Sequence, residues 1–166
     1  MYTISNFKYL ADLQEELDSL EQALEEKLET TVRPAMKKAI CDLYDMLKVF
    51  LEKGDLDVVE GEGSFNAAYK KMSIGVLIVA EGFALKLSIN SEEVDIIKVI
   101  TRPTKYSSPR KTVKNDLLSK KIEELQNDTD EIKGTLSSYD NLQVVYTNDN
   151  NQRFNAPEKV IEAYFK

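Results

Sequence analysis

The chain has 166 residues, of which 42% are hydrophobic and 31% are charged, and its formal net charge is -7. A chain of this length buries roughly 70% of its unfolded surface, which is enough for one domain with a hydrophobic core. It contains no histidine and a single cysteine, so its residues exclude histidine-based catalytic triads, zinc sites of histidine or thiolate ligands, and an intramolecular disulfide.

The composition also predicts where the protein resides. A single cysteine fits a reducing compartment, and the first residues lack the basic region and apolar run of a signal peptide. The longest apolar run, Ile74–Ala80, is too short to span a bilayer. We therefore expect a soluble, cytoplasmic protein without membrane contact. Cys41 lies in an apolar helical pattern and is interpreted as a small core residue.

A row of leucines predicts that the first helix carries one narrow apolar stripe. Leu10, Leu13, Leu17, Leu20 and Leu24 recur at spacings of three and four residues. Such a stripe suits the seam of a coiled coil. Two interpretations are open: the leucines pack on the next helix and the sheet of the same chain, or they form a self-association surface. An unpaired stripe would expose apolar area, which favours a homodimer.

Acidic residues fill the other faces of this first helix. Residues 1–31 carry eight acids and two lysines, so the segment has a charge of -6 and accounts for most of the net charge. An exposed acidic helix attracts a basic partner surface or imitates the charge of a nucleic acid. The candidate residues for this partner surface are Glu15, Asp18, Glu21 and Glu25.

A second helix is predicted from Ala35 to Lys53, because apolar residues again recur at spacings of three and four. Pro34 has no backbone N–H and disfavours helical geometry in the residue before it. The two helices therefore form either an αα-hairpin or one long helix kinked at Pro34. We expect residues 1–54 to be an N-terminal helical region that packs with an α+β region, residues 55–166, as one domain.

The stretch from 74 to 102 predicts the centre of an antiparallel sheet. Residues 74–80 are apolar on both parities, as in a strand covered on both faces, and residues 83–89 alternate between apolar and polar. Glu81-Gly82 forms a turn between them, and Val94–Thr101 is a third strand. Helices on either side of this stretch are expected to cover the sheet.

The flanking segments add weaker elements. Residues 55–71 are interpreted as a connector with a short strand at 56–59, and their Gly61-Glu62-Gly63-Ser64 as a plain turn, because it lacks the spacing of a phosphate loop. A further helix is predicted from Val113 to Lys133, with Gly134 as its stop. A strand at 142–147, a turn, a short hairpin arm at 152–154 and a terminal helix complete the chain.

The predicted fold is thus α+β, with an antiparallel sheet of three to five strands covered by helices. Its predicted core consists of apolar residues from the second helix, the strands and the third helix. These are Leu43, Leu47, Phe50, Val76, Ile78, Phe83, Leu85, Leu87, Leu118, Ile122 and Leu125.

One segment, residues 102–114, is basic and contains no acid. Ser108-Pro109 within it resembles the start of a helix, where free backbone N–H groups and the positive end of the helix dipole favour an anion. The segment is therefore a candidate site for a phosphate or carboxylate. The candidate residues are Arg102, Lys105, Tyr106, Arg110, Lys111 and Lys114.

The order of these elements resembles that of the small acidic chaperones of bacterial secretion systems, and this resemblance implies a dimer that binds partner chains. The leading hypothesis is a non-enzymatic protein-binding module, such as a chaperone, inhibitor or adaptor, that acts through its acidic helix on a basic partner. The alternative is that residues 102–114 bind a nucleotide or nucleic acid. No enzyme, metal or cofactor is predicted, because carboxylate pairs such as Glu60 and Glu62 are explained as surface and turn residues.

Overall fold

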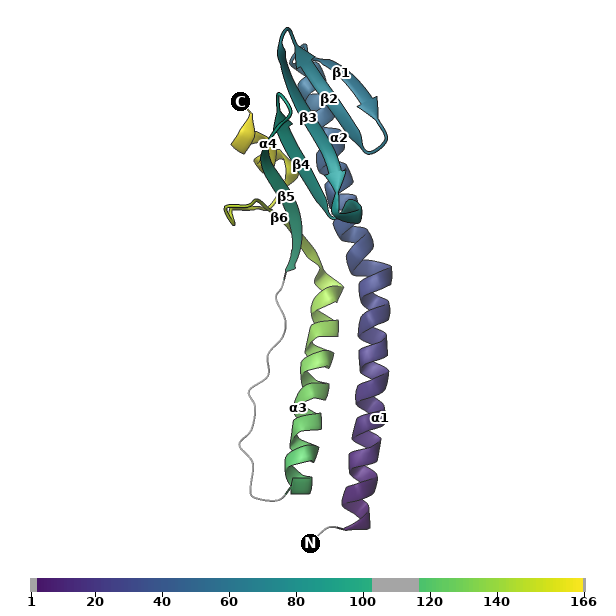
Figure 1. The fold of residues 1–166 in the computed structure, drawn as a ribbon. Coiled ribbons are helices and arrows are strands. Elements are labelled where there is room, and N and C mark those ends of the chain that lie inside the picture. The colour runs from purple at the N-terminus through teal and green to yellow at the C-terminus, as the bar shows by residue number, and fades with distance from the viewer. Residues whose placement is uncertain (1–2, 103–116, 166) are drawn as a thin grey trace. The chain divides into compact units, whose positions relative to one another are not determined.

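The computed structural model describes residues 3–102 and 117–165 (Figure 1). Its contacts divide the chain into two compact units. Unit 1 comprises Met1–Val32 and Pro103–Leu142, and unit 2 comprises Arg33–Arg102 and Gln143–Lys166. The chain passes between the units three times, so each unit is assembled from two segments that are distant in the sequence.

Unit 1 is built on two helices, α1 (Ile4–Lys27) and α3 (Leu117–Ser138). A π-helical turn, η1 (Leu28–Val32), continues α1, and a 3₁₀ turn, η3 (Tyr139–Asn141), follows α3. The two helices lie side by side and run in the same direction (Figure 1). The side-chain contacts of α1 confirm this direction, because residues later in α1 contact residues later in the segment of α3 and η3. The contacts join Tyr9 to Gln126, Glu16 to Lys133 and Lys27 to Asp140.

The leucine stripe of α1 packs along α3. Leu13 and Leu17 are buried, and Leu10, Leu20 and Leu24 are partly buried. Within the chain, the partner of the stripe is therefore α3, and not the following helix and the sheet as one interpretation of the sequence had it. Self-association through these leucines stays a prediction.

No loop separates α1 from α2 (Arg33–Lys53), so the long-helix alternative is confirmed and the αα-hairpin is wrong. In a regular α-helix a proline ring clashes with the carbonyl four residues earlier. The carbonyl four residues before Pro34 belongs to η1, which is a wider, π-helical turn. The predicted stop of α3 at Gly134 is also wrong. The helix continues to Ser138 because Thr135, which is buried, extends its packed face.

Unit 2 contains a seven-stranded antiparallel sheet in which the spatial order of the strands equals their order in the sequence. The three strands expected between residues 74 and 102 are present, and so are those near residues 56–59, 142–147 and 152–154. The strands are β1 (Asp57–Gly61), β2 (Ser64–Tyr69), β3 (Met72–Val79), β4 (Ala84–Ile89), β5 (Glu92–Arg102), β6 (Gln143–Thr147) and β7 (Arg153–Phe154).

Seven strands exceed the three to five predicted, mainly because residues 55–71 are not a connector. They form the hairpin of β1 and β2, in which Phe65 and Ala67 face the core. The predicted plain turn joins these strands, and Gly63 adopts a positive φ of 66° there. The turn η2 (Ala80–Gly82) joins β3 to β4, and Gly82 has the expected positive φ, 98°.

Two helices, α2 and α4 (Pro157–Tyr164), cover one face of this sheet. Five predicted core residues are buried there, and Leu118 is buried in unit 1, whereas Ile78, Phe83, Ile122 and Leu125 are only partly buried. Phe50 is 36% exposed and Cys41 is exposed, so both predictions for α2 are wrong at these positions. The five buried residues are Leu43, Leu47, Val76, Leu85 and Leu87.

The packed face of α3 contains one unsatisfied hydroxyl, that of Thr129. The residue is 3% exposed, and its Oγ1 has no hydrogen-bond partner. Burying a hydroxyl without a partner costs free energy, so we expect Thr129→Val to raise the free energy of unfolding by about 1 kcal/mol, measured by urea denaturation. Thr135→Val is the matched control, because the Thr135 hydroxyl donates to the carbonyl of Glu131 at 3.0 Å. An equal gain for both variants would contradict this account.

Candidate binding surfaces

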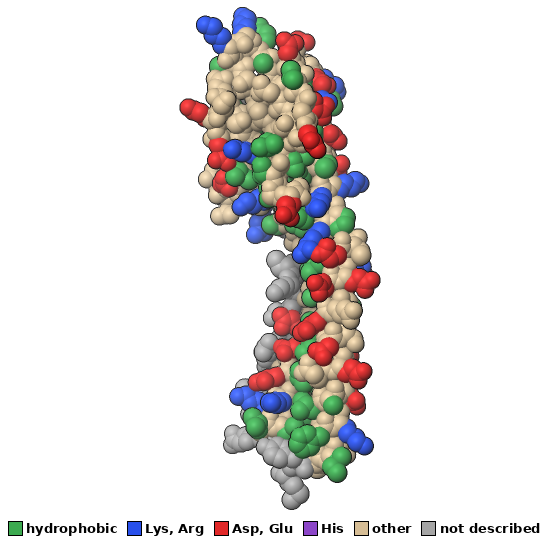
Figure 2. Space-filling model, turned by 45° about the vertical axis from the view of Figure 1, so that its right-hand side comes forward, with side chains coloured by type: hydrophobic (Ala, Val, Ile, Leu, Met, Phe, Trp, Pro, Cys, Tyr) green, Lys and Arg blue, Asp and Glu red, His purple; other side chains and the backbone are tan. Residues whose placement is uncertain are grey.

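The charge of the chain is concentrated on unit 1. Its described residues, 3–32 and 117–142, carry fourteen acids and five lysines, which gives a charge of -9. The described residues of unit 2 carry fourteen acids and twelve basic residues, a charge of -2. Figure 2 shows acidic side chains following α1 along its length. The pair of parallel helices α1 and α3, called here the helix pair, is therefore a strongly negative surface.

All four acids predicted to form the partner surface, Glu15, Asp18, Glu21 and Glu25, are exposed on α1. Two other acids of unit 1, Glu16 and Asp140, are paired with lysines. Glu16 accepts a hydrogen bond from Lys133 at 2.8 Å, which raises the pKa of that lysine.

The helix pair also has a groove whose lining includes apolar side chains and comes, on α1, from the N-terminal half of the helix. It has a volume of about 530 Å³ and lies between α1 and α3. Phe7 is 57% exposed there, and Leu10 and Leu125 are partly buried. Glu124 and Lys121 are among its polar lining residues. The helix pair thus combines negative charge with exposed apolar surface, which is the combination that an amphipathic basic segment requires.

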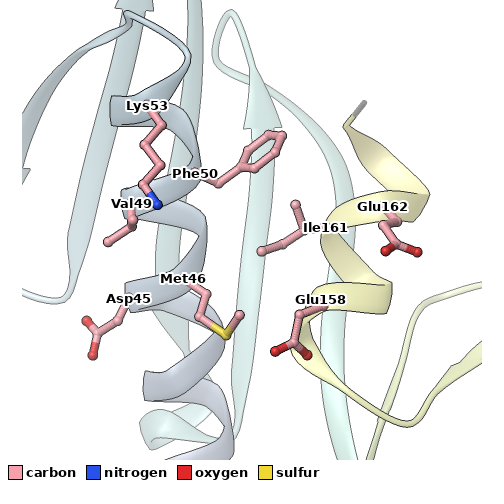
Figure 3. Close-up of a pocket in the computed structure, with 8 residues that line it drawn as sticks. All are labelled: Asp45, Met46, Val49, Phe50, Lys53, Glu158, Ile161 and Glu162. Atoms are coloured by element: carbon pink, nitrogen blue, oxygen red, sulfur yellow. The ribbon is translucent and has the colours of Figure 1, made fainter.

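Unit 2 carries a second groove, between α2 and α4, which we call the α2–α4 groove. Figure 3 shows its lining, in which Phe50, Met46 and Ile161 project into the space between the two helices. The groove has a volume of about 480 Å³. Sequence reasoning missed it because its two sides come from segments more than a hundred residues apart.

A buried polar network connects β5, the β6–β7 turn and α4. Asp95 is 6% exposed and accepts hydrogen bonds from the backbone N–H groups of Ile96, at 2.9 Å, and Asp149, at 3.1 Å, and from the hydroxyl of Tyr164. The Tyr164 hydroxyl accepts in turn from the side-chain amide of Asn148, at 3.0 Å. Every side chain in this network is occupied by a partner from the same unit, which indicates a structural role.

We expect the folded protein to lose stability at alkaline pH because of two tyrosines in unit 2. Burial raises the pKa of Tyr146 and of Tyr164 from 10.0 to about 12, and the bond to Asp95 contributes for Tyr164. The unfolded chain releases these protons near pH 10 while the folded chain retains them. The contribution of these two tyrosines to the free energy of unfolding is therefore fully present below pH 10 and is lost between about pH 10 and 12. Urea denaturation over this range should show a shallower fall for Tyr146→Phe combined with Tyr164→Phe; an unchanged fall would contradict the assignment.

The predicted anion site lies outside the described residues, with one partial exception. Lys105, Tyr106, Arg110, Lys111 and Lys114 fall in the segment that is not described, and only the backbone of Arg102, at the end of β5, is described. Binding of a phosphate ligand by this segment stays a prediction.

Comparisons with protein-family models, curated proteins and solved structures found no match. Among residues 3–102 and 117–165, no helix is long and apolar enough to cross a membrane, and no cluster of three or more acidic or cysteine side chains could hold a metal ion. What supports a function is therefore the distribution of charge and the two grooves.

Proposed function

We propose that this protein is a non-enzymatic protein-binding module that holds a basic partner protein against its helix pair. The observation that carries the proposal is the excess of acids on the described residues of unit 1, fourteen against five lysines. Unit 2 is close to neutral by comparison, so the acidity is a property of one surface and not of the whole chain.

The physical effect of this charge is to attract and orient a cationic partner. Like charges along two adjacent helices repel each other and disfavour the compact state, so folding does not explain why acids outnumber lysines there. A basic partner relieves that repulsion when it binds, and the field of the surface accelerates its association. An inhibitor of this kind would occupy a nucleic-acid-binding protein by imitating the charge of its ligand, whereas a chaperone or adaptor would hold a basic segment of another chain.

The groove of the helix pair supplies the apolar part of the interface. Charged rims give specificity and association rate, but most binding free energy comes from a few buried apolar contacts. Phe7, Leu10 and Leu125 offer such contacts. The proposed partner segment is therefore an amphipathic helix with apolar residues on one face and lysine or arginine on the other.

A pair of synthetic helical peptides tests the proposal. The leucine–lysine peptide carries leucine on one face and lysine on the other, and in the leucine–glutamate peptide glutamate replaces lysine. The full chain should bind the leucine–lysine peptide at about 0.05 M salt and lose most of that affinity at about 0.3 M salt, because exposed charges are screened. It should not bind the leucine–glutamate peptide. Equal binding of both peptides, or affinity that is independent of salt, would refute the proposal.

A further inference from the structure

We infer that the α2–α4 groove of unit 2 is a second binding site, which takes an apolar segment of a partner protein flanked by lysine or arginine. The site is separate from the helix pair in both residues and unit. The inference goes beyond the proposed function, since it holds whether or not the helix pair binds a basic partner.

The floor of the groove is apolar and open. Val49 is 46% exposed and Phe50 is 36% exposed, and both line the groove together with Met46 and Ile161. An adjoining face of α2 is already used, because Leu43, Leu47 and Leu51 are buried against the sheet. Helix α2 is therefore apolar on a wider arc than its packing on the sheet requires. The groove volume of about 480 Å³ lies within the range of ligand-binding clefts, which can accept one or two large side chains.

The charged residues at the rim of the groove favour a partner segment that has lysine or arginine on either side of its apolar part. Asp45, Glu158 and Glu162 line it together with a single base, Lys53. Figure 3 shows Asp45 on α2 and Glu158 on α4 at the same end of the groove. Lys159 pairs with Glu162 at 3.1 Å, which leaves Asp45 and Glu158 against Lys53, an excess of one acid. An apolar side chain that enters between the helices thus places neighbouring lysine or arginine side chains close to carboxylates.

The same charges argue against a second copy of this chain as the occupant. In a two-fold symmetric contact, each copy presents the same patch to the other. The rim of one copy, which has a net negative charge, would then meet the equally negative rim of the other, and like charges across an interface are unfavourable. A basic segment of a different protein fits the groove better than a second copy does.

The test is the leucine–lysine peptide added to the isotopically labelled full chain, with binding followed by the amide NMR signals of each segment. We expect saturating shifts in residues 45–53 and 158–162. Val49→Lys should weaken the affinity measured from these signals about tenfold, because it adds a like charge to the floor. The matched control is Val59→Lys on β1, where the side chain is 72% exposed and does not line the groove; it should change nothing.

Shifts confined to α1 and α3 would overturn this inference and leave the proposed function intact. Shifts at residues 45–53 and 158–162 that are equal in the unmodified chain and in Val49→Lys would also overturn it. Conversely, shifts in the groove without shifts in the helix pair would refute the proposed function alone. A one-dimensional spectrum of each variant verifies that it is folded.

Discussion

Replacing Asp95 by alanine is expected to lower the free energy of unfolding by about 3 kcal/mol, measured by urea denaturation at neutral pH. The carboxylate is buried and accepts from two backbone N–H groups and the Tyr164 hydroxyl. Alanine would leave these donors buried without an acceptor. The network joins β5 to the β6–β7 turn and to α4, so its loss weakens the attachment of the C-terminal segment to unit 2.

Three control variants separate this effect from the loss of a charge. Tyr164→Phe removes one donor and leaves Asp95 its two amide partners, so it should cost about 1 kcal/mol. Asp95→Asn retains an acceptor and should fall between the two. Asp57→Ala removes an exposed carboxylate from β1 and should stay within about 0.5 kcal/mol of the unmodified chain. If Asp95→Ala changed the free energy of unfolding no more than Asp57→Ala does, the network would not contribute to stability.

The central strands were predictable because local pattern and burial agree there. In β4, Leu85 and Leu87 alternate with Lys86 and Ser88, and the side chains of the two leucines are buried. Strand β2 was missed although it alternates in the same way. Its inward positions are held by Phe65 and Ala67, and alanine contributes little to an apolar pattern. The strand also follows a turn that separates it from the β-branched runs.

Partners distant in the sequence were not predictable. The stripe of α1 indicates an apolar face but does not say which element covers it. The bonds from α1 to α3 and η3 join residues more than a hundred positions apart. Phe50 was placed in the core by its spacing after Leu47, yet it faces the α2–α4 groove, because the apolar arc of α2 is wider than its contact with the sheet. The spacing of apolar residues indicates on which face of a helix a side chain lies, but it does not indicate whether another element packs against that face.

One signal for the buried network was present in the sequence. Asp95 shares its strand parity with Ile97 and Val99, both of which are buried. A carboxylate on the same face of a strand as two apolar residues is either exposed at the end of the strand or buried with hydrogen-bond donors. Its three partners come from residues 96, 149 and 164, and their meeting depends on the turn after β6 and on α4.

The most direct test of the helix pair is to neutralise its predicted partner surface. The variant Glu15→Gln, Asp18→Asn, Glu21→Gln, Glu25→Gln removes four charges from exposed positions on α1. Its control, Asp57→Asn, Glu62→Gln, Glu92→Gln, Glu93→Gln, removes four charges from exposed positions on unit 2. Both variants have the same net charge, so only the position of the missing charges differs between them. Stability should not fall in the α1 variant, since neutralisation removes repulsion.

The decisive measurement is a calorimetric titration of the leucine–lysine peptide into the unmodified chain and both variants at low salt. We expect the α1 variant to bind about tenfold more weakly than the unmodified chain, while the unit 2 control retains nearly the full affinity. Equal weakening in both variants would show that the peptide responds to net charge alone. That result would contradict the assignment of a partner-binding surface to the helix pair.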